Sequence, residues 1–250
     1  MIKKPIIQIS SLVKKYVGAT QNAVDSLGLE IYSGDIFGLL GPNGAGKTTT
    51  ISMLCGLIAP DSGTIKIKDF YQPHNQENIK RIIGVVPQEL ALYDNLTAHE
   101  NLYFFGKMFG IKSNVLKSRI VFFLKKFSLQ DKSDKRVSTF SGGMKRRLNL
   151  IAGILHNPEI LFLDEPTVGI DVQSKNVIIE YLKELNNSGT TIIYTSHLME
   201  EAENLCSNIS IIDLGKEIAN GKPIELLSKN PDCKNLEEVF LKLTGKSVRE

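Results

Sequence analysis

The stretch from Gly41 to Thr49 constrains the fold of this chain more than any other part of its sequence. It contains the pattern G-x-x-x-x-G-K-[ST], spelled by Gly41, Pro42, Asn43, Gly44, Ala45, Gly46, Lys47, Thr48 and Thr49. Glycines leave backbone N–H groups free to converge on phosphate oxygens, Lys47 adds a positive charge, and the Thr48 hydroxyl is suited to bind Mg²⁺. The pattern predicts a loop that binds the phosphates of a nucleotide.

The residues on both sides of this loop fit the same prediction. An apolar run at 36–40 suits a buried strand, and Ile51, Leu54 and Leu57 follow the loop at helical spacing. A helix that begins at the loop adds the positive end of its dipole to the phosphate site. We therefore expect strand, loop and helix in that order, within an α/β fold.

Composition restricts the class of protein. With 250 residues, 42% hydrophobic and 23% charged, the chain is typical of a globular protein with an ordinary core. No apolar run approaches the roughly 18 residues that span a bilayer, and the residues 1–5 lack the apolar region of a signal peptide. Three widely separated cysteines, Cys55, Cys206 and Cys233, argue against a disulfide framework or a zinc site. We expect a cytosolic protein.

A second decisive stretch is an apolar strand at 159–163 that ends in two adjacent carboxylates, Asp164 and Glu165. Neighbouring residues of a strand face opposite ways, so one carboxylate would face a metal and the other a water molecule. A purely structural role explains the pair poorly, because burying an unpaired charge is costly.

Two further strands end in polar side chains. Gln88 follows the buried strand 82–86, and His197 follows the strand 191–195. In a parallel sheet the strand ends lie on one edge, where open α/β folds bind their ligands. We therefore expect Gln88, Asp164, Glu165 and His197 beside the phosphate loop.

The sequence Ser141-Gly142-Gly143 precedes a helix predicted over 144–156. A hydroxyl, uncovered N–H groups and the helix dipole make a second potential anion site, although an N-cap with flexible glycines has the same sequence. The following Lys145-Arg146-Arg147 points in different directions around the helix, which makes a poor stripe for nucleic acid.

Between residues 89 and 157 the pattern is helical. Thr97 and Glu100 form a capping box that opens a helix with Leu102, Phe105 and Phe109 facing inward. Its aromatic cluster (Tyr103, Phe104, Phe105 and Phe109) suits a core better than a partner-binding surface. The amphipathic helix at 115–127 suits packing within a lobe better than lying on a membrane.

The rest of the chain continues the alternation of strand and helix. Asp171 opens a long helix, residues 208–222 form two short strands, and a final amphipathic helix ends at Gly245. Earlier in the chain Tyr16 lies in a turn. Its ring suits either stacking on a nucleotide base or ordinary half-buried packing.

Over nearly its whole length the sequence resembles the ATP-binding subunit of ABC transporters. The phosphate loop, Gln88, the signature Ser141-Gly142-Gly143, the pair Asp164-Glu165, Asp171 and His197 occur in the order and approximate spacing of that family. The signature helix and the closing segment 236–245 are more similar to the branch that serves multidrug or other export-type permeases.

The resemblance implies a P-loop NTPase core with a mostly parallel sheet, an N-terminal antiparallel β subdomain and a helical signature subdomain. Residues 1–250 would form a single ABC ATPase domain. Its core would comprise 1–88 and 158–222, its helical subdomain 89–157, and its C-terminal helical tail 223–250.

The resemblance also implies residue roles, with ATP and Mg²⁺ as cofactors. Tyr16 would stack on adenine, the loop 41–49 would hold the phosphates through Lys47, and Asp171 would belong to the nucleotide site. Thr48, Gln88 and, through water, Asp164 would organise Mg²⁺. Glu165 would polarise the attacking water and His197 would contact the γ-phosphate.

By the same resemblance two such domains associate head to tail, with each ATP between one copy's phosphate loop and the other's signature. The partners would be a second copy or a paralogous subunit and an integral membrane permease, whose coupling helix would dock near Gln88 on the inner face of the membrane. No nucleic acid is expected. Phe140, Met144 and the segment 168–170 depart from the common pattern, which affects dimer contacts more than phosphate contacts.

Two alternatives carry different functions. A soluble ABC-type ATPase acting on ribosomes or nucleic acid usually has two ATPase domains or a long coiled-coil insertion, and neither is visible. A stand-alone phosphate-loop kinase or GTPase would not need the Ser141-Gly142-Gly143 signature or His197. The transported cargo, its direction, the permease and the choice between homodimer and heterodimer leave no trace in the sequence.

Overall fold

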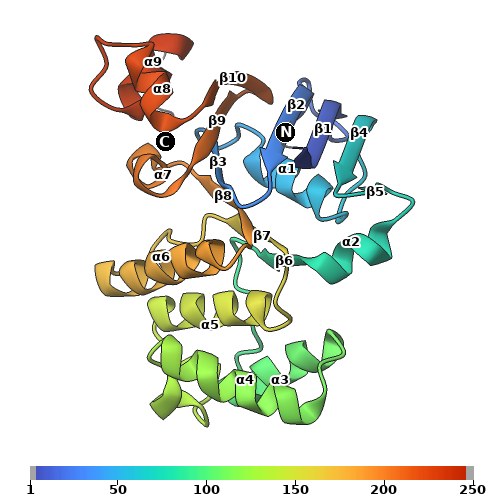
Figure 1. The fold of residues 1–250 in the computed structure, drawn as a ribbon, viewed down its shortest axis with the longest axis vertical. Helices are drawn as coiled ribbons and strands as arrows, with labels where there is room; N and C mark the ends of the chain where they lie inside the picture. Colours follow the sequence, from blue (N-terminus) through green and yellow to red (C-terminus); the bar gives the residue numbers. More distant parts are fainter. Residues whose placement is uncertain (1–3, 246–250) are drawn as a thin grey trace. The chain divides into compact units, whose positions relative to one another are not determined.

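The computed structural model describes residues 4–245 and divides the chain into two compact units. The first unit contains the residues up to 80 and those from 191 onward, and the second contains residues 81–190 (Figure 1). Residues 1–3 and the end of the expected C-terminal tail, 246–250, lie outside the described residues. The expected subdomain boundaries stay a prediction.

The first unit contains an antiparallel sheet near the N-terminus. Its strand order is β2-β1-β4-β5, formed by β1 (Pro5–Lys14), β2 (Val24–Tyr32), β4 (Ser62–Ile67) and β5 (Phe70–Tyr71). Ile7, Ile9 and Leu12 of β1 are buried, and β2 alternates buried with exposed residues. One face of this sheet therefore packs on the core, as in most antiparallel sheets.

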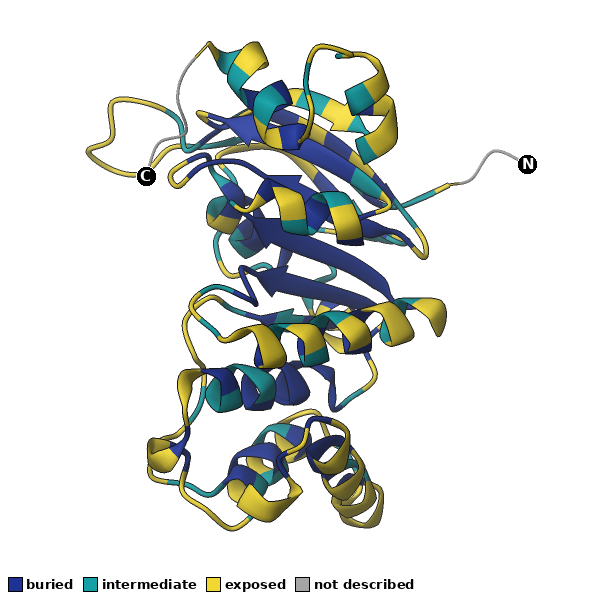
Figure 2. Cartoon of the chain, turned by 90° about the vertical axis from the view of Figure 1, so that its left-hand side faces the viewer, coloured by how far each residue is buried: buried dark blue, intermediate teal, exposed yellow. Residues whose placement is uncertain are grey.

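The strands that flank the phosphate loop are parallel. In the order β10-β9-β3-β8, β3 (Ile36–Leu40) runs parallel to both β8 (Thr191–Ser196) and β9 (Asn208–Asp213), while β10 (Lys216–Gly221) is antiparallel to β9. All residues of β3 and β8 are buried, as Figure 2 shows for the central strands. Continuous apolar runs of this kind are typical of strands covered on both faces.

Helices complete the first unit. α1 (Lys47–Leu54) follows the phosphate loop, and α7 (Met199–Leu205) packs against β3 and β8. α8 (Pro223–Ser228) and α9 (Leu236–Thr244) pack together, and a left-handed Gly245 ends α9 as expected. α2 (Gln76–Ile82), which the sequence analysis does not predict, lies where the chain passes to the second unit.

The second unit combines two parallel strands with four helices and two short 3-10 turns. β6 (Ile83–Val86) pairs with β7 (Ile160–Asp164). The helices are α3 (Ala98–Met108), α4 (Ser113–Lys126), α5 (Gly142–Ile154) and α6 (Val172–Asn187). The turns are Gln130–Lys132 and Val137–Thr139. α5 is central, because it packs against β6 and against the other three helices.

Two glycines bring α5 directly onto β6. A Cβ added to Gly84 would collide with the carbonyl oxygen of Gly153, and one added to Gly153 would lie 2.6 Å from Val86 Cγ2. Because neither residue carries a side chain, the helix and strand backbones touch. At this distance the helix and the strand are closely packed and cannot easily shift past each other.

Two expectations about apolar residues are wrong. The helix after the phosphate loop ends at Leu54, and Leu57 is 72% exposed because a left-handed Gly56 turns the chain away. The aromatic cluster of α3 is not core, since Phe104 and Phe109 are 40% and 44% exposed and Tyr103 and Phe105 are half-buried.

The position of α3 explains the exposed rings. Its buried side consists of small or aliphatic residues and one asparagine (Ala98, Asn101, Leu102 and Gly106), so the rings fall on the other side. There Phe104 and Phe105 pack on each other and on Tyr93, with ring centroids 5.2 to 6.2 Å apart. Helical spacing alone does not show which side of a helix has a neighbour.

The prediction for the next helix is confirmed. Leu116, Ile120, Phe123 and Leu124 of α4 are buried within the unit, although Val121 and Phe122 on the opposite side stay exposed. Cys55 and Cys206 are buried and Cys233 is half-buried. Across residues 4–245 we find no helix with the length and apolar character needed to cross a membrane.

Candidate functional site

The phosphate loop of the first unit adopts a conformation that only glycine accommodates. Gly41, Gly44 and Gly46 have φ values of 156°, 79° and 105°, and a Cβ on Gly41 would collide with the Ile212 carbonyl oxygen. Lys47 is only 5% exposed, and its Nζ donates to the carbonyl oxygens of Gly41 at 2.9 Å and Pro42 at 3.1 Å. The lysine is thus held over its own loop.

The first turn of α1 faces this loop without a side-chain cap. Gly46 is the N-cap and offers no side-chain oxygen to the first N–H groups of the helix. Asn43, Gly44 and Thr48 are exposed. Uncapped N–H groups at an exposed helix start bind anions readily, and the phosphate-binding role of this loop stays a prediction.

The first unit also brings Tyr16 and the end of β8 to this loop. Tyr16 is 47% exposed, and its hydroxyl lies 3.3 Å from Thr49 Oγ1. The backbone N–H of Gly41 donates to the Ser196 carbonyl at 3.4 Å, directly before His197. Tyr16, the loop and the residues preceding His197 therefore share one region of the unit, as expected.

In the second unit Gln88 and Glu165 meet. Gln88 Nε2 donates to Glu165 Oε2 at 3.0 Å, so two residues 77 positions apart come together at the ends of β6 and β7. Asp164 and Glu165 are 4% and 5% exposed. Two buried carboxylates and the Gln88 amide thus lie at the ends of these strands, and their role in catalysis stays a prediction.

The argument that Asp164 and Glu165 alternate along a strand is wrong for Glu165. β7 ends at Asp164, and Glu165 has a left-handed φ of 47°. Few residues other than glycine adopt this conformation, which is strained and concentrates at functional sites. The turn at Glu165, rather than the pleat of a strand, sets the direction of its side chain.

The signature Ser141-Gly142-Gly143 opens α5. Ser141 is the N-cap, and its Oγ accepts a hydrogen bond from Met144 N at 3.3 Å. Ser141 and Gly142 are exposed, whereas Gly143 is buried and a Cβ there would lie 2.6 Å from Asp171 Oδ2. The N-cap interpretation is confirmed, and the helix start also presents an accessible serine and glycine to solvent.

Asp171 caps α6. Its two carboxylate oxygens accept from the backbone N–H and the hydroxyl of Ser174, both at 2.8 Å. These hydrogen bonds, that of the backbone N–H above all, hold the pKa of Asp171 below its usual value. Its described contacts are those of a helix cap, and its role in nucleotide binding stays a prediction.

The basic run after the signature does point in different directions, as expected. Lys145 Nζ pairs with Asp94 at 2.7 Å, and Arg147 Nη1 donates to the Phe127 carbonyl at 2.7 Å. Each side chain is engaged within the second unit. A stripe for nucleic acid is therefore not formed here.

Arg146 is the residue that sequence reasoning missed. Its Nη1 donates to the Gln88 carbonyl oxygen at 2.5 Å and its Nη2 to the Val168 carbonyl oxygen at 3.4 Å. Burial lowers the pKa of Arg146 and the charge of Glu165 opposes this effect. In the sequence Arg146 is an arginine three residues after Gly143, and nothing in the pattern around it indicates these contacts.

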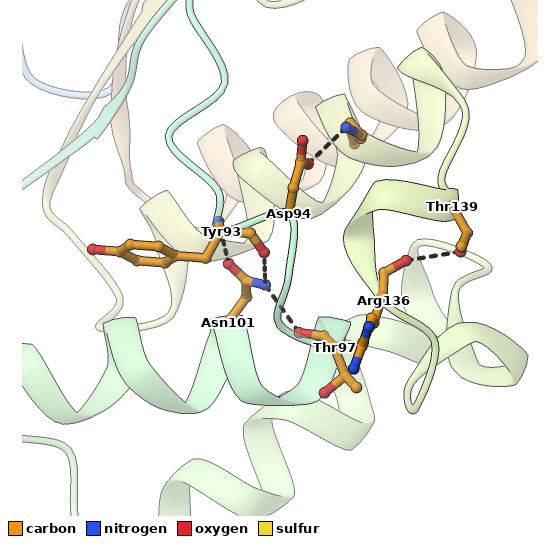
Figure 3. A network of polar contacts seen from close by, with 7 residues as sticks. Tyr93, Asp94, Thr97, Asn101, Arg136 and Thr139 are labelled. Atoms are coloured by element: carbon orange, nitrogen blue, oxygen red, sulfur yellow. Dashed lines mark hydrogen bonds and ion pairs between the residues drawn. The ribbon is translucent and has the colours of Figure 1, made fainter.

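A polar network holds the segment that follows Gln88. Asn101 accepts from Tyr93 N at 2.8 Å and donates to the carbonyl oxygens of Tyr93 and Thr97, both at 3.0 Å. Figure 3 shows these residues beside the Asp94 ion pair. The same network includes the 3-10 turn Val137–Thr139, where the Thr139 hydroxyl donates to the Arg136 carbonyl oxygen at 2.7 Å.

The described residues contain no group of three or more His, Cys, Asp or Glu side chains able to hold a metal ion by themselves. The predicted Mg²⁺ ligands are oxygen donors from Thr48, Gln88 and Asp164. Mg²⁺ is commonly held by one or two carboxylates together with water and substrate phosphates, so this donor set fits the ion.

Comparison with known proteins agrees with this geometry. The family model described as ABC transporter matches residues 24–168. The linearmycin resistance ATP-binding protein LnrL of Bacillus subtilis is 48% identical over 224 residues, which cover 90% of this chain and 71% of the relative. The Nod factor export ATP-binding protein I of Ralstonia nicotianae is 42% identical over 93% of this chain and 72% of its own.

A solved structure of an ATP-binding subunit of an ABC transporter has the same fold. It superposes with a TM-score of 0.87 at 26% identity, covering 96% of this chain and 99% of the other. The P-loop core with an N-terminal antiparallel sheet, a mostly parallel core sheet and a helical part is thereby confirmed.

Proposed function

Since this chain belongs to the ABC transporter family, we propose how its residues carry out the family's reaction. The protein is an ATPase that binds ATP and powers a membrane permease, as ATP-binding subunits of export transporters do. One relative is named for Nod factor export and another for linearmycin resistance. For this chain we propose the export of a drug, lipid or other small molecule.

The observation that carries the proposed ATP site is the loop itself. Its glycine conformations, uncapped α1 start and buried Lys47 form a cradle for the β and γ phosphates. On binding, Lys47 Nζ exchanges the carbonyl oxygens of Gly41 and Pro42 for phosphate oxygens. The half-exposed ring of Tyr16, close to Thr49, stacks on the adenine.

The carboxylates of the second unit supply the chemistry of ATP hydrolysis in this proposal. Glu165 orients the attacking water and accepts its proton, while His197 contacts the γ-phosphate. Thr48, Gln88 and, through water, Asp164 would hold Mg²⁺, which neutralises phosphate charge when bound. Before that, Gln88 keeps the Glu165 carboxylate in place through the 3.0 Å hydrogen bond.

Dimerisation completes the site in this proposal. Ser141 and Gly142 are exposed at the start of α5, which supports their use as an anion site for the nucleotide held by another copy. The partner is a second copy or a paralogous subunit. The permease docks beside Gln88, where the exposed Leu90, Tyr93 and Phe104 offer apolar contacts, and the subunit works on the inner face of the membrane.

A substitution at Glu165 tests the reaction. Glu165→Gln keeps the shape of the side chain and its contact with Gln88 but cannot accept a proton. We expect ATP hydrolysis to fall at least about 100-fold while ATP binding stays, because general-base catalysis contributes roughly 10² to 10⁴. Hydrolysis at the parental rate would remove Glu165 from this role.

Purification from detergent extracts tests the partner. A tagged protein expressed at its native level should be recovered with an integral membrane protein. Recovery with ribosomes and no membrane protein would support the soluble alternative instead, which gains no support from the names of the relatives.

A further inference from the structure

We propose that Arg146 is a positioning residue that holds two loops of the second unit in place for ATP hydrolysis. We call residues 87–97, between β6 and α3, the Gln88 loop, and residues 165–171, between β7 and α6, the Glu165 loop. The inference rests on the proposed roles of Gln88 and Glu165, and it adds a residue that touches neither nucleotide nor water in the proposed site.

The contacts of Arg146 form a closed circuit with these loops. Nη1 binds the Gln88 carbonyl oxygen at 2.5 Å and Nη2 reaches the Val168 carbonyl oxygen at 3.4 Å. The Gln88 side chain returns to Glu165 at 3.0 Å. A guanidinium presents its donors in a rigid planar fork, so one side chain fixes the spacing of two backbones, which an ammonium on a flexible stem does poorly.

Electrostatics favours the same arrangement. The Arg146 guanidinium is half-buried, and the attraction of the Glu165 carboxylate opposes part of the effect of its desolvation. The Gln88 carbonyl oxygen gains a charge-assisted hydrogen bond, which is roughly twice as strong as a neutral one, and the Val168 carbonyl oxygen gains a longer and weaker one. Arg146 is therefore held by the two loops as much as it holds them.

Two other side chains of α5, Lys145 and Asn149, hold only the Gln88 loop. Asn149 Oδ1 accepts from Ala91 N at 3.2 Å, and Lys145 pairs with Asp94 at 2.7 Å. Among the bonds described for these three side chains, only those of Arg146 extend to the Glu165 loop. This distinguishes a residue that aligns Gln88 with Glu165 from residues that merely pin a loop.

The expected kinetic effect is on turnover rather than on substrate binding. The Gln88 amide changes partner during the reaction, whereas Arg146 contacts only backbone oxygens and keeps both loops fixed throughout. Without it the Glu165 carboxylate loses its alignment with the water, and a misplacement of about 1 Å costs about 10² in rate. The phosphate loop lies in the other unit and keeps its own hydrogen bonds.

The first experiment compares Arg146→Ala and Arg146→Lys with Arg119→Ala. Arg119 is a matched control, because it is also partly buried in the second unit and donates to a backbone carbonyl, that of Leu155 at 2.5 Å. For Arg146→Ala we expect kcat to fall roughly 10- to 100-fold with KM for ATP within about twofold. Arg146→Lys should recover only part of kcat, and Arg119→Ala should lower the melting temperature without lowering kcat.

A double-mutant cycle with Gln88→Ala shows whether Arg146 acts through Gln88. If it does, Arg146→Lys lowers kcat by a smaller factor in the Gln88→Ala background than in the parent. Equal factors in both backgrounds, or a kcat for Arg146→Lys equal to that of Arg119→Ala, would overturn the inference. Should Arg146→Ala fail to fold, the cycle with Arg146→Lys still decides. If Glu165→Gln hydrolyses ATP normally, the proposed site fails instead.

Discussion

Lys47 illustrates how the site is prepared before any nucleotide arrives. Its stem is buried, and its ammonium already donates to two carbonyl oxygens of the loop it serves. A flexible lysine would lose about 2 kcal/mol of rotamer entropy on binding phosphate. Because Lys47 is already ordered in the folded protein, most of this entropy is lost on folding rather than on binding. The buried lysine thus stabilises the loop, and in the proposed site it would favour tight binding.

Replacing Lys47 should weaken ATP binding. We expect Lys47→Ala to lower affinity roughly 10- to 100-fold, because a hydrogen bond to a charged group contributes about 1.5 to 3 kcal/mol. The measurement is fluorescence titration with a labelled ATP analogue, and Lys80→Ala on the exposed side of α2 serves as the charge-matched control. An unchanged dissociation constant for Lys47→Ala would contradict this role.

At this scale sequence reasoning found residues that belong to a known chemical pattern and missed those that act through geometry. The loop, Gln88, Asp164 and Glu165 each stand at the end of an apolar strand, which a sequence displays directly. Arg146 acts through backbone carbonyl oxygens 22 and 58 positions away in the chain. No local pattern encodes such a partner, because carbonyl groups are the same in every residue.

Among the elements, α3 begins with a reciprocal cap. Thr97 Oγ1 accepts from Glu100 N at 3.1 Å, and Glu100 Oε2 accepts from Thr97 N at 2.8 Å. The capping box is confirmed as predicted from sequence. Because Thr97 also closes the Asn101 network of Figure 3, the cap fixes both the helix and the segment that leads to it.

Removing this cap should cost measurable stability. We expect Thr97→Ala to reduce the free energy of unfolding by about 1 kcal/mol, which corresponds to about 2 to 4 °C in melting temperature for a domain of this size. Ser118→Ala on the exposed side of α4 is the control and should change neither. Equal melting temperatures for Thr97→Ala and the parent protein would show that the cap is not stabilising.

His156 joins three elements and should make stability depend on pH. Its ring stacks on Phe109 at 3.7 Å, its Nε2 donates to the Ile83 carbonyl oxygen at 2.8 Å, and its Nδ1 is buried with no partner among the described residues. Burial lowers the pKa of His156, the hydrogen bond to Ile83 opposes this in part, and the nearby charge of Arg119 adds to the lowering. If a second proton bound to Nδ1, the resulting N–H group would have no hydrogen-bond acceptor among the described residues.

The sign of the pH effect follows from the lowered pKa. Below the unfolded-state pKa of about 6.5, His156 binds a proton in the unfolded chain but not in the folded protein. The free energy of unfolding is therefore highest above that pH and decreases as the pH falls toward the folded-state pKa. Urea unfolding at pH 7.5 and 5.5 should therefore show a smaller loss for His156→Gln than for the parent. The same loss in both proteins would assign the pH dependence to other groups.

Predictions of elements succeeded where periodicity was long. β2 shows clear alternation, β3 and β8 are continuous apolar runs, and α4 and α9 show helical spacing over their length. The shorter α2, α7 and α8 span six or seven residues each, which is too few to show a helical period. The exposed rings of α3 were misassigned because the periodicity of a helix does not depend on which side its neighbours occupy.

At the scale of the whole molecule, the proposed dimer places each ATP between two copies. In this proposal one chain carries two kinds of anion site, the phosphate loop at α1 and the signature at α5. A copy that lacks one kind of site would still provide the other to its partner. The two defects should therefore complement each other.

Mixing two inactive variants tests this arrangement. We expect Lys47→Ala and Ser141→Arg each to be nearly inactive alone, and an equal mixture to regain ATP hydrolysis, because a mixed dimer contains one site with an intact loop and an intact signature. The rate should rise steeply with protein concentration at low concentration, as expected for an assembling enzyme. A mixture as inactive as its components would argue that each copy works alone.

The contact between Gly84 and Gly153 has a mechanical consequence. With the two backbones touching, β6 and α5 behave as one stiff body that carries the Gln88 loop at one end of the strand and the signature at the start of the helix. A push on the Gln88 loop, as from a permease, would be transmitted to the signature with little lost to compression. β6 and α5 would then move together as a rigid body, and a bulky residue at position 153 would separate the helix from the strand.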